Sequence, residues 1–236
     1  MTFPFRFAAL ALTALPLTAI TLQVDFDHAG TTQSGWQSIA AGDSALGDSW
    51  SKNFTGGVSL DVDAVGGIVL DTRDRAGANG GGGEASMWRD FLFANGSTSS
   101  ATGSGLSLAF TGLQANSEYP VKIWAHDSGS GSGRAADWSG GGSAVARLVT
   151  GGTPATLADS FVTINVTTNG SGAVTISGIV SAINPNGSHN VFVNGLEIGD
   201  PVSTDGPTDI ALSNLTIAKT APIGTNVGSL STTDPT

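Results

Sequence analysis

Glycine-rich stretches interrupt this chain so often that only short segments can form regular structure. Three of them are Gly81–Gly83, Ser128–Gly133 and Gly140–Gly142. Because glycine loses more conformational freedom on folding than any other residue, such stretches disfavour helix. Between the glycines, apolar and polar residues alternate in short runs, which is typical of half-buried β-strands. The sequence therefore predicts an all-β protein in which only Glu84–Phe93 could form a helix, or else a further strand.

The alternating runs mark the predicted strands of one large domain. They are Leu22–Phe26, Val58–Val62, Ile68–Asp71, Leu106–Thr111, Tyr119–His126, Ala144–Val149, Phe161–Thr167, Ala173–Ile179 and Asn190–Ile198. Strands at this spacing predict two packed antiparallel sheets, that is, a β-sandwich or jelly roll. A polar turn between Gly112 and Tyr119 predicts a crossing from one sheet to the other, with the Tyr119 ring buried and its hydroxyl bonded to backbone.

Charge and cysteine content exclude several classes of function. The chain has 19 acidic and 9 basic residues, a net charge of −10, and no cysteine. Such a chain repels the phosphates of nucleic acids and of anionic membranes, so we expect no nucleic-acid partner. Disulfides, thiolate metal sites and cysteine nucleophiles are excluded. An exported protein without cysteine is ordinary for a bacterium, which is the source we expect.

The N-terminus has the pattern of an export signal. Arg6 precedes an apolar run from Phe7 to Leu17, and a cut after Ala19 would remove residues 1–19 as a signal peptide. The alternatives are an uncleaved anchor or a first core strand. No later segment is apolar enough to span a bilayer. We therefore expect a secreted or cell-surface location and no membrane span in the mature chain.

The composition changes near residue 200 and predicts a second domain. Residues 20–200 form the predicted jelly roll, and residues 201–206 are rich in turn residues and read as a linker. After the linker, Ile210–Ser213 and Val227–Ser231 resemble strands, but two strands cannot bury a core alone. The expected architecture is a β-sandwich followed by the truncated start of a second β-sandwich at residues 207–236.

Residues 207–236 contain several short motifs in a characteristic order. They are Pro207-Thr208-Asp209-Ile210-Ala211-Leu212-Ser213, Ala221-Pro222-Ile223-Gly224-Thr225, Val227-Gly228-Ser229-Leu230 and Thr233-Asp234-Pro235. With this spacing the segment resembles the opening of a bacterial cadherin-like repeat. The resemblance implies a surface stalk used in cell adhesion, other cell-surface proteins as partners, and Ca²⁺ held at domain junctions, here by Asp205 and Asp234. Lys219 stands where the family has a glutamate ligand, and its charge opposes a cation.

Two further segments carry a resemblance for residues 20–200. Val24-Asp25-Phe26 opens the domain, and Val191-Phe192-Val193-Asn194-Gly195-Leu196-Glu197-Ile198 closes it. In this the region resembles malectin-like and galactose-binding-like jelly rolls. The resemblance implies that the first and last strands are adjacent, that a structural calcium lies near them, and that the ligand is a polysaccharide or another glycan.

One cluster of residues is the candidate ligand site. It consists of Trp124, His126, Asp127, Arg134, Asp137 and Trp138, at the end of a predicted strand and in the glycine-rich loop after it. Exposed aromatic faces stack on sugar rings, while Asp and Arg hydrogen-bond sugar hydroxyls. We expect Trp138 to be exposed, because its neighbours are too small to bury it. Trp124 alternates in register and could instead be core.

Other charged residues carry weaker signals. Asp61 and Asp63 fail the calcium-loop pattern and read as solvent-facing strand residues. The run Asp71–Arg75, with Arg89 and Asp90 beyond it, could hold a catalytic carboxylate pair, but salt bridges framing a loop are the stronger interpretation. No catalytic or zinc motif is present, so we expect no enzyme activity. The leading hypothesis is an adhesion or binding protein; the alternatives are a non-catalytic fragment of a carbohydrate-active enzyme and a structural spacer.

Overall fold

The structure is a computed structural model, and nearly all of its regular structure is β. It describes residues 22–28, 32–39, 47, 49–75, 85–96, 103–127, 129, 133–184, 189–203, 209–213, 222, 225 and 228–233. In these residues the one helix is α1 (Ala85–Arg89), and no helix has the length and apolar character needed to cross a bilayer. The predicted all-β class is therefore confirmed. The predicted signal peptide lies outside the described residues.

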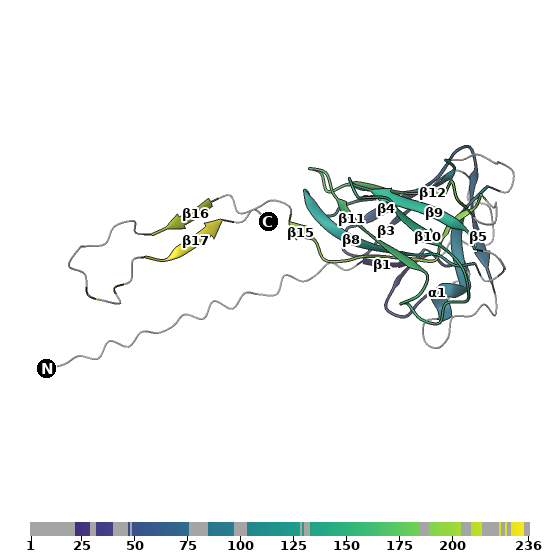
Figure 1. The fold of residues 1–236 in the computed structure, drawn as a ribbon, viewed down its shortest axis with the longest axis horizontal. Coiled ribbons are helices and arrows are strands. Elements are labelled where there is room, and N and C mark those ends of the chain that lie inside the picture. The colour runs from purple at the N-terminus through teal and green to yellow at the C-terminus, as the bar shows by residue number, and fades with distance from the viewer. Residues whose placement is uncertain are drawn as a thin grey trace.

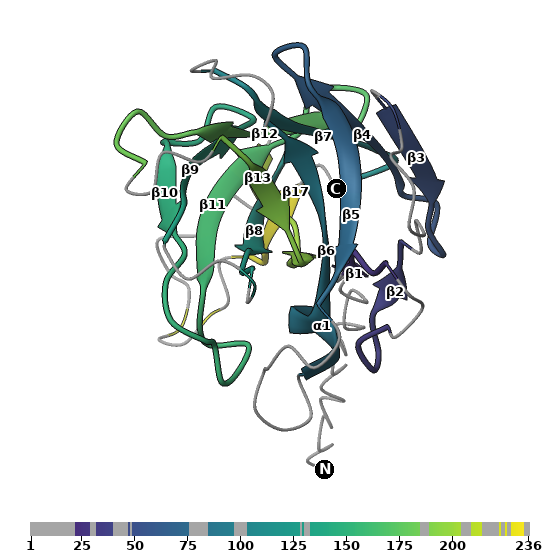
Figure 2. The same ribbon diagram turned by 90° about the vertical axis from the view of Figure 1, so that its right-hand side faces the viewer.

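Two six-stranded sheets form a β-sandwich (Figures 1 and 2). The first, called the β8 sheet, contains in spatial order β11 (Phe161–Thr167), β8 (Ser117–Trp124), β14 (Gly195–Ile198), β1 (Leu22–Asp25) and β2 (Gln37–Ser38), with β15 (Val202–Ser203) also on β8. The second, called the β7 sheet, contains β10 (Ala146–Val149), β9 (Ala135–Gly140), β12 (Val174–Val180), β7 (Gly105–Thr111), β4 (Ser59–Val65) and β3 (Ser49–Asn53).

The first and last long strands of the sandwich lie side by side, as predicted. β1 pairs antiparallel with β14, with Leu22 opposite Ile198 and Asp25 opposite Gly195. β14 then pairs with β8. All other pairings among the described strands are antiparallel except the short parallel one between β1 and β2. The antiparallel β-sandwich is thus the architecture of this domain.

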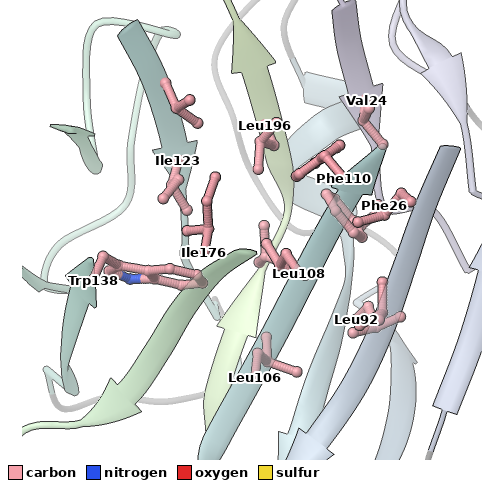
Figure 3. Close-up of a cluster of buried hydrophobic side chains, with 14 of the residues drawn as sticks. Val24, Phe26, Leu92, Leu106, Leu108, Phe110, Ile123, Trp138, Ile176 and Leu196 are labelled. Carbon is pink, nitrogen blue, oxygen red and sulfur yellow. The ribbon is translucent and has the colours of Figure 1, made fainter. Parts of the chain in front are cut away.

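The core lies between the two sheets and is built from one face of each (Figure 3). Val24, Ile123 and Leu196 come from the β8 sheet, and Leu108 and Ile176 from the β7 sheet; all are fully buried. On β4, buried Leu60 and Val62 alternate with exposed residues, as the period of a half-buried strand requires. Burying apolar area at roughly 25 cal/mol per Å² is the main force that holds these layers together.

Tyr119 fixes the crossing from the β7 sheet to the β8 sheet. Its ring is buried, and its hydroxyl accepts a hydrogen bond from the backbone N–H of Gln114 at 2.9 Å. Gly112 begins the turn with φ +82, and a Cβ there would collide with the carbonyl oxygen of Gly57. Only glycine fits both conditions. The predicted sheet-to-sheet crossing is confirmed.

A third, three-stranded sheet lies at the end of the sandwich that faces the viewer in Figure 2. It contains β5 (Val69–Asp74), β6 (Asp90–Asn95) and β13 (Val191–Val193), with β6 in the middle, and is called the short sheet. The sequence left helix and strand open for the segment Glu84–Phe93, and the structure contains both, because helix α1 runs directly into β6. Asn194 divides β13 from β14, so the predicted strand Asn190–Ile198 serves two sheets.

The region after residue 200 contains two features. Val202 and Ser203 pair with Glu118 and Ser117 of β8, so the first residues of the predicted linker belong to the sandwich. β16 (Asp209–Leu212) and β17 (Leu230–Thr233) form a two-stranded antiparallel sheet, and β17 begins three residues later than its predicted start. The cadherin-like nature of this region stays a prediction.

Candidate functional site

A cavity of about 220 Å³ lies on one face of the short sheet, and three arginines line it. They are Arg73 on β5, Arg75 just after it, and Arg134 just before β9, with the carboxylate of Asp127 among them. Phe91 and Phe93 of β6 provide apolar lining, and Asn95 and Asn190 add side-chain amides. We call this cavity the arginine pocket.

Strand register explains why these residues meet. Arg73 lies opposite Phe91, and Phe93 lies opposite Phe192 of β13. Since side chains alternate across a strand, Arg73, Phe91 and Phe93 share one face of the short sheet, whereas Leu92 faces the sandwich core. Arg134 and Asp127 reach this face from the two sides of the β8–β9 connection. The pocket therefore combines segments from distant parts of the sequence.

Asp127 is held by two guanidinium groups. Arg75 donates from Nε to Oδ1 at 2.8 Å and from Nη2 to Oδ2 at 3.1 Å, and Arg134 Nη1 lies 3.4 Å from Oδ2. The side chain of Asp127 is only 3% exposed. Burial raises its pKa, but the hydrogen bonds from Arg75 and Gly129 and the charges of Arg75 and Arg134 together bring it below the usual value. Asp127 is therefore ionised.

Each arginine of the pocket lies over a phenylalanine ring. The guanidinium carbon of Arg73 is 5.5 Å from the centroid of Phe93, and that of Arg75 is 5.9 Å from Phe91. Arg134 lies 5.3 Å from the centroid of Phe192. A guanidinium held near an aromatic ring by a cation–π contact loses little further freedom when it binds a ligand. The pocket is in this sense preorganised.

The predicted ligand cluster is divided among four places: the arginine pocket, the surface of the β7 sheet, the core between the sheets and a separate aromatic cluster. Arg134 and Asp127 do line a common pocket. Asp137 instead forms a bidentate salt bridge with Arg147 of β10, at 2.6 and 2.9 Å, on the surface of the β7 sheet. Asp137 is not among the described residues that line the arginine pocket.

The prediction that Trp138 is exposed is wrong. Trp138 lies on β9, not in a loop, and its side chain is completely buried between the sheets (Figure 3). Its indole packs against Gly178 of β12, directly opposite in register. Its sequence neighbours are indeed too small to cover it, but residues of another strand do so. A fully buried ring cannot stack on a ligand at the surface.

Trp124 and His126 belong to a small aromatic cluster with Trp88, Trp36 and Met87. Trp124 is buried, so the core alternative for this residue is correct, and its Nε1 donates to the carbonyl of Leu157 at 2.8 Å. His126 meets Trp88 edge-on, and neither of its ring nitrogens has a hydrogen-bond partner in the described part of the chain. Burial lowers the His126 pKa, which Asp127 only partly offsets.

Sequence reasoning missed Arg73, Arg75, Phe91 and Phe93 as site residues. It assigned the mixed charge run to salt bridges, and this holds for Arg89, which pairs with Asp74 at 2.7 and 2.8 Å. Arg75, however, pairs with Asp127, 52 residues away. The available signal was the alternation of Arg73 on β5 with Arg75 just after it, and of Phe91 with Phe93 on β6, which places each pair on a common face.

Other candidate sites carry less chemistry. Asp61 and Asp63 are exposed, as predicted, and line a wide surface depression of about 550 Å³ with Ser49, Trp50 and Ser51. Among the residues whose placement is described, no three His, Cys, Asp or Glu side chains could hold a metal ion. Asp205 and Asp234, the predicted calcium ligands, lie outside the described residues.

Comparisons with known proteins give only distant likenesses. No protein-family model matches the chain, and no curated protein matches it. Among solved structures, CBM35 from Cellvibrio japonicus Abf62 is 16% identical and matches 53% of this chain and 82% of its own, with a TM-score of 0.28. A Bacillus thuringiensis Cry1Da tryptic core variant is 14% identical over 57% of this chain and 24% of its own, with a TM-score of 0.29.

A third solved structure covers more of the chain. The Stig cyclase Fisc from Fischerella sp. TAU is 13% identical, and the match covers 77% of this chain and 99% of that one, with a TM-score of 0.33. Likenesses at this level are too distant to transfer a ligand or an activity to this chain.

Proposed function

We propose that this protein is an exported bacterial binding protein whose β-sandwich binds a glycan in the arginine pocket. The observation that carries the proposal is the convergence of guanidinium donors and side-chain amides on a cavity with phenylalanine in its walls. A sugar presents hydroxyl groups at its edge and C–H groups on its faces, so it needs this mixture of polar and apolar contacts. The resemblance to glycan-binding jelly rolls and the export pattern of the N-terminus agree with this function.

The direct test is glycan-array binding by the purified full chain and by two matched variants. Arg73→Gln removes a pocket arginine whose side chain is 45% exposed, and Arg147→Gln removes a surface arginine that is 39% exposed and lies on β10. Both variants change the charge by the same amount and neither disturbs the core. We expect the wild type and Arg147→Gln to bind the same glycans, and Arg73→Gln to lose them. Absence of any glycan binding would favour a structural spacer.

The proposal extends to the region after the sandwich. Residues 207–236 would open a cadherin-like repeat, which would place the glycan-binding domain on a cell-surface stalk used in adhesion. Ca²⁺ would be held near Asp205 and Asp234. The measurement is the melting temperature of the full chain with Ca²⁺ and with a chelator, for the wild type and for Asp234→Asn. A Ca²⁺-dependent rise that the variant lacks would support this extension, and identical curves would count against it.

A further inference from the structure

The arginine pocket has more positive than negative charge. Arg73, Arg75 and Arg134 line it, and their acidic partners are Asp127 and, for Arg73, Asp71 at 3.5 Å. This leaves one positive charge without a counterpart among the groups that the structure pairs there. The chain as a whole has a net charge of −10. A cationic cavity on so acidic a protein is the opposite of what the overall composition leads one to expect.

Donor groups of the pocket also remain unused. Arg75 donates from Nε and Nη2 to Asp127, and its Nη1 makes no hydrogen bond to another described residue. The Nε of Arg134 is buried and has no hydrogen-bond partner among the described residues. Arg134 is 16% exposed, and burial and the nearby charge of Arg75 lower its pKa, while Asp127 alone opposes them. A buried N–H of this kind costs free energy unless a ligand or water accepts from it.

We propose that the arginine pocket binds an anionic sugar through its carboxylate or sulfate group, an inference that rests on the proposed glycan-binding function. The oxyanion would supply the missing negative charge and accept from the unused guanidinium N–H groups, as planar guanidinium forks do with carboxylates and other oxyanions. Asp127 does not neutralise the third arginine, because its carboxylate is already bound by Arg75 and Arg134. Phe91 and Phe93 form part of the pocket wall but are only 2% and 4% exposed, so the guanidinium groups would make most of the contact with the ligand.

The size of the pocket limits what enters it. A cavity of about 220 Å³ has room for roughly seven water molecules at about 30 Å³ each. It is smaller than the roughly 300–1,000 Å³ cavities that hold drug-sized ligands. One sugar residue with its charged group fits this volume better than a stretch of several residues. The pocket therefore recognises a chain end or a side branch.

Two pairs of polymers test the charge of the ligand. Polygalacturonate is compared with its carboxyl-reduced form, and dextran sulfate with dextran, each for retention of the wild-type full chain. Within a pair only the anionic group differs, and the two pairs distinguish carboxylate from sulfate. We expect retention by at least one anionic member and none by its neutral counterpart. Retention should weaken as NaCl screens the charges.

Three variants locate the binding. Arg73→Gln should weaken binding of the anionic polymer by about tenfold or more, because a hydrogen bond to a charged group is lost. Arg73→Lys keeps the charge but not the planar fork, so its loss should be smaller. Arg147→Gln should bind like the wild type. Unchanged melting temperatures of all three would show that the differences do not come from unfolding.

The outcomes separate this inference from the proposed function. Equal binding of neutral and anionic polymers, lost in Arg73→Gln, would overturn the anion requirement and leave glycan binding intact. Binding of polyglutamate but of no polysaccharide would overturn both, since the partner would then be an acidic protein. Equal losses in Arg73→Gln and Arg147→Gln would show general attraction to cationic surface groups and would overturn the inference.

Discussion

The indole ring of Trp138 on β9 lies against the Cα of Gly178, its partner in register on β12. A Cβ at position 178 would be 2.6 Å from the Cη2 and Cζ3 atoms of the ring. This fully buried tryptophan thus fits inside the sandwich only because the neighbouring strand has no side chain there.

The first prediction concerns this contact. Gly178→Ala should lower the free energy of unfolding by about 1–3 kcal/mol, the usual cost of overpacking a core. Urea denaturation measures the change. Gly151→Ala is the matched control, because a Cβ at that exposed glycine would meet no atom within 4 Å. Equal stability of the two variants would mean that Trp138 does not occupy this position in solution.

The same contact shows where local sequence reasoning ends. Alternation located most strands of the sandwich, since each such strand buries one face. Strand β9 was not predicted, because the side chains on its inward face are small, as at Ala136, apart from Trp138. A single large apolar residue does not make an alternating pattern. What buries Trp138 comes from β12, about forty residues further along the chain. Burial by a distant strand leaves no mark on the sequence near the buried residue.

The pocket was predictable only in part for the same reason. Arg134 and Asp127 are seven positions apart and could be grouped from the sequence. The pairing of Arg75 with Asp127 depends on how β5 and β8 are arranged in space. Local alternation can place Arg73 and Arg75 on one face of a strand, but it cannot say which loop covers that face.

The second prediction concerns the ion pair in the pocket. Asp127→Asn should lower the free energy of unfolding by about 1–3 kcal/mol, because two partly buried guanidinium groups lose their shared carboxylate. Asp137→Asn breaks the solvent-exposed pair with Arg147 and should have a small effect. Thermal unfolding with added sodium sulfate completes the test. Sulfate should restore stability to Asp127→Asn more than to Asp137→Asn, and equal responses would contradict the cationic pocket.

The third prediction concerns Asp25, at the closing pair of strands. Burial, and then the charges of Asp90 and Asp27, raise the Asp25 pKa to about 8 against a hydrogen bond from the Gln33 backbone. The folded state therefore keeps a proton that the unfolded state loses above about pH 4. The contribution of Asp25 to the free energy of unfolding is therefore largest at low pH. It declines as pH rises from about 4 to 8, by up to about 1.4 kcal/mol per pH unit.

Asp25→Asn should remove this pH dependence, because an amide stays neutral throughout. The check is the free energy of unfolding measured at several pH values for the wild type and the variant. Asp61→Asn removes a charge of the same size at an exposed position of β4 and serves as control. A stability difference between wild type and Asp25→Asn that does not vary with pH would contradict the raised pKa.

The fourth prediction concerns His126, whose effect has the opposite sign. Burial lowers its pKa from 6.5, so the folded state is neutral while the unfolded state takes up a proton below pH 6.5. The contribution of His126 to the free energy of unfolding is therefore lost as the pH falls below 6.5. His126→Phe should flatten this acid branch, since no ring nitrogen of His126 has a partner to lose within the described residues. The same unfolding series measures it, and an unchanged acid branch would show that other groups cause it.

The central claim is that ligand binds in the arginine pocket, and NMR of the arginine Nε–H groups tests it most directly. A short galacturonate oligomer is titrated into the full chain. The account predicts shifts for Arg73, Arg75 and Arg134, and none for Arg89 and Arg147, whose side chains pair with Asp74 and Asp137 outside the pocket. Shifts confined to Arg89 or Arg147, with the three pocket arginines unchanged, would contradict it.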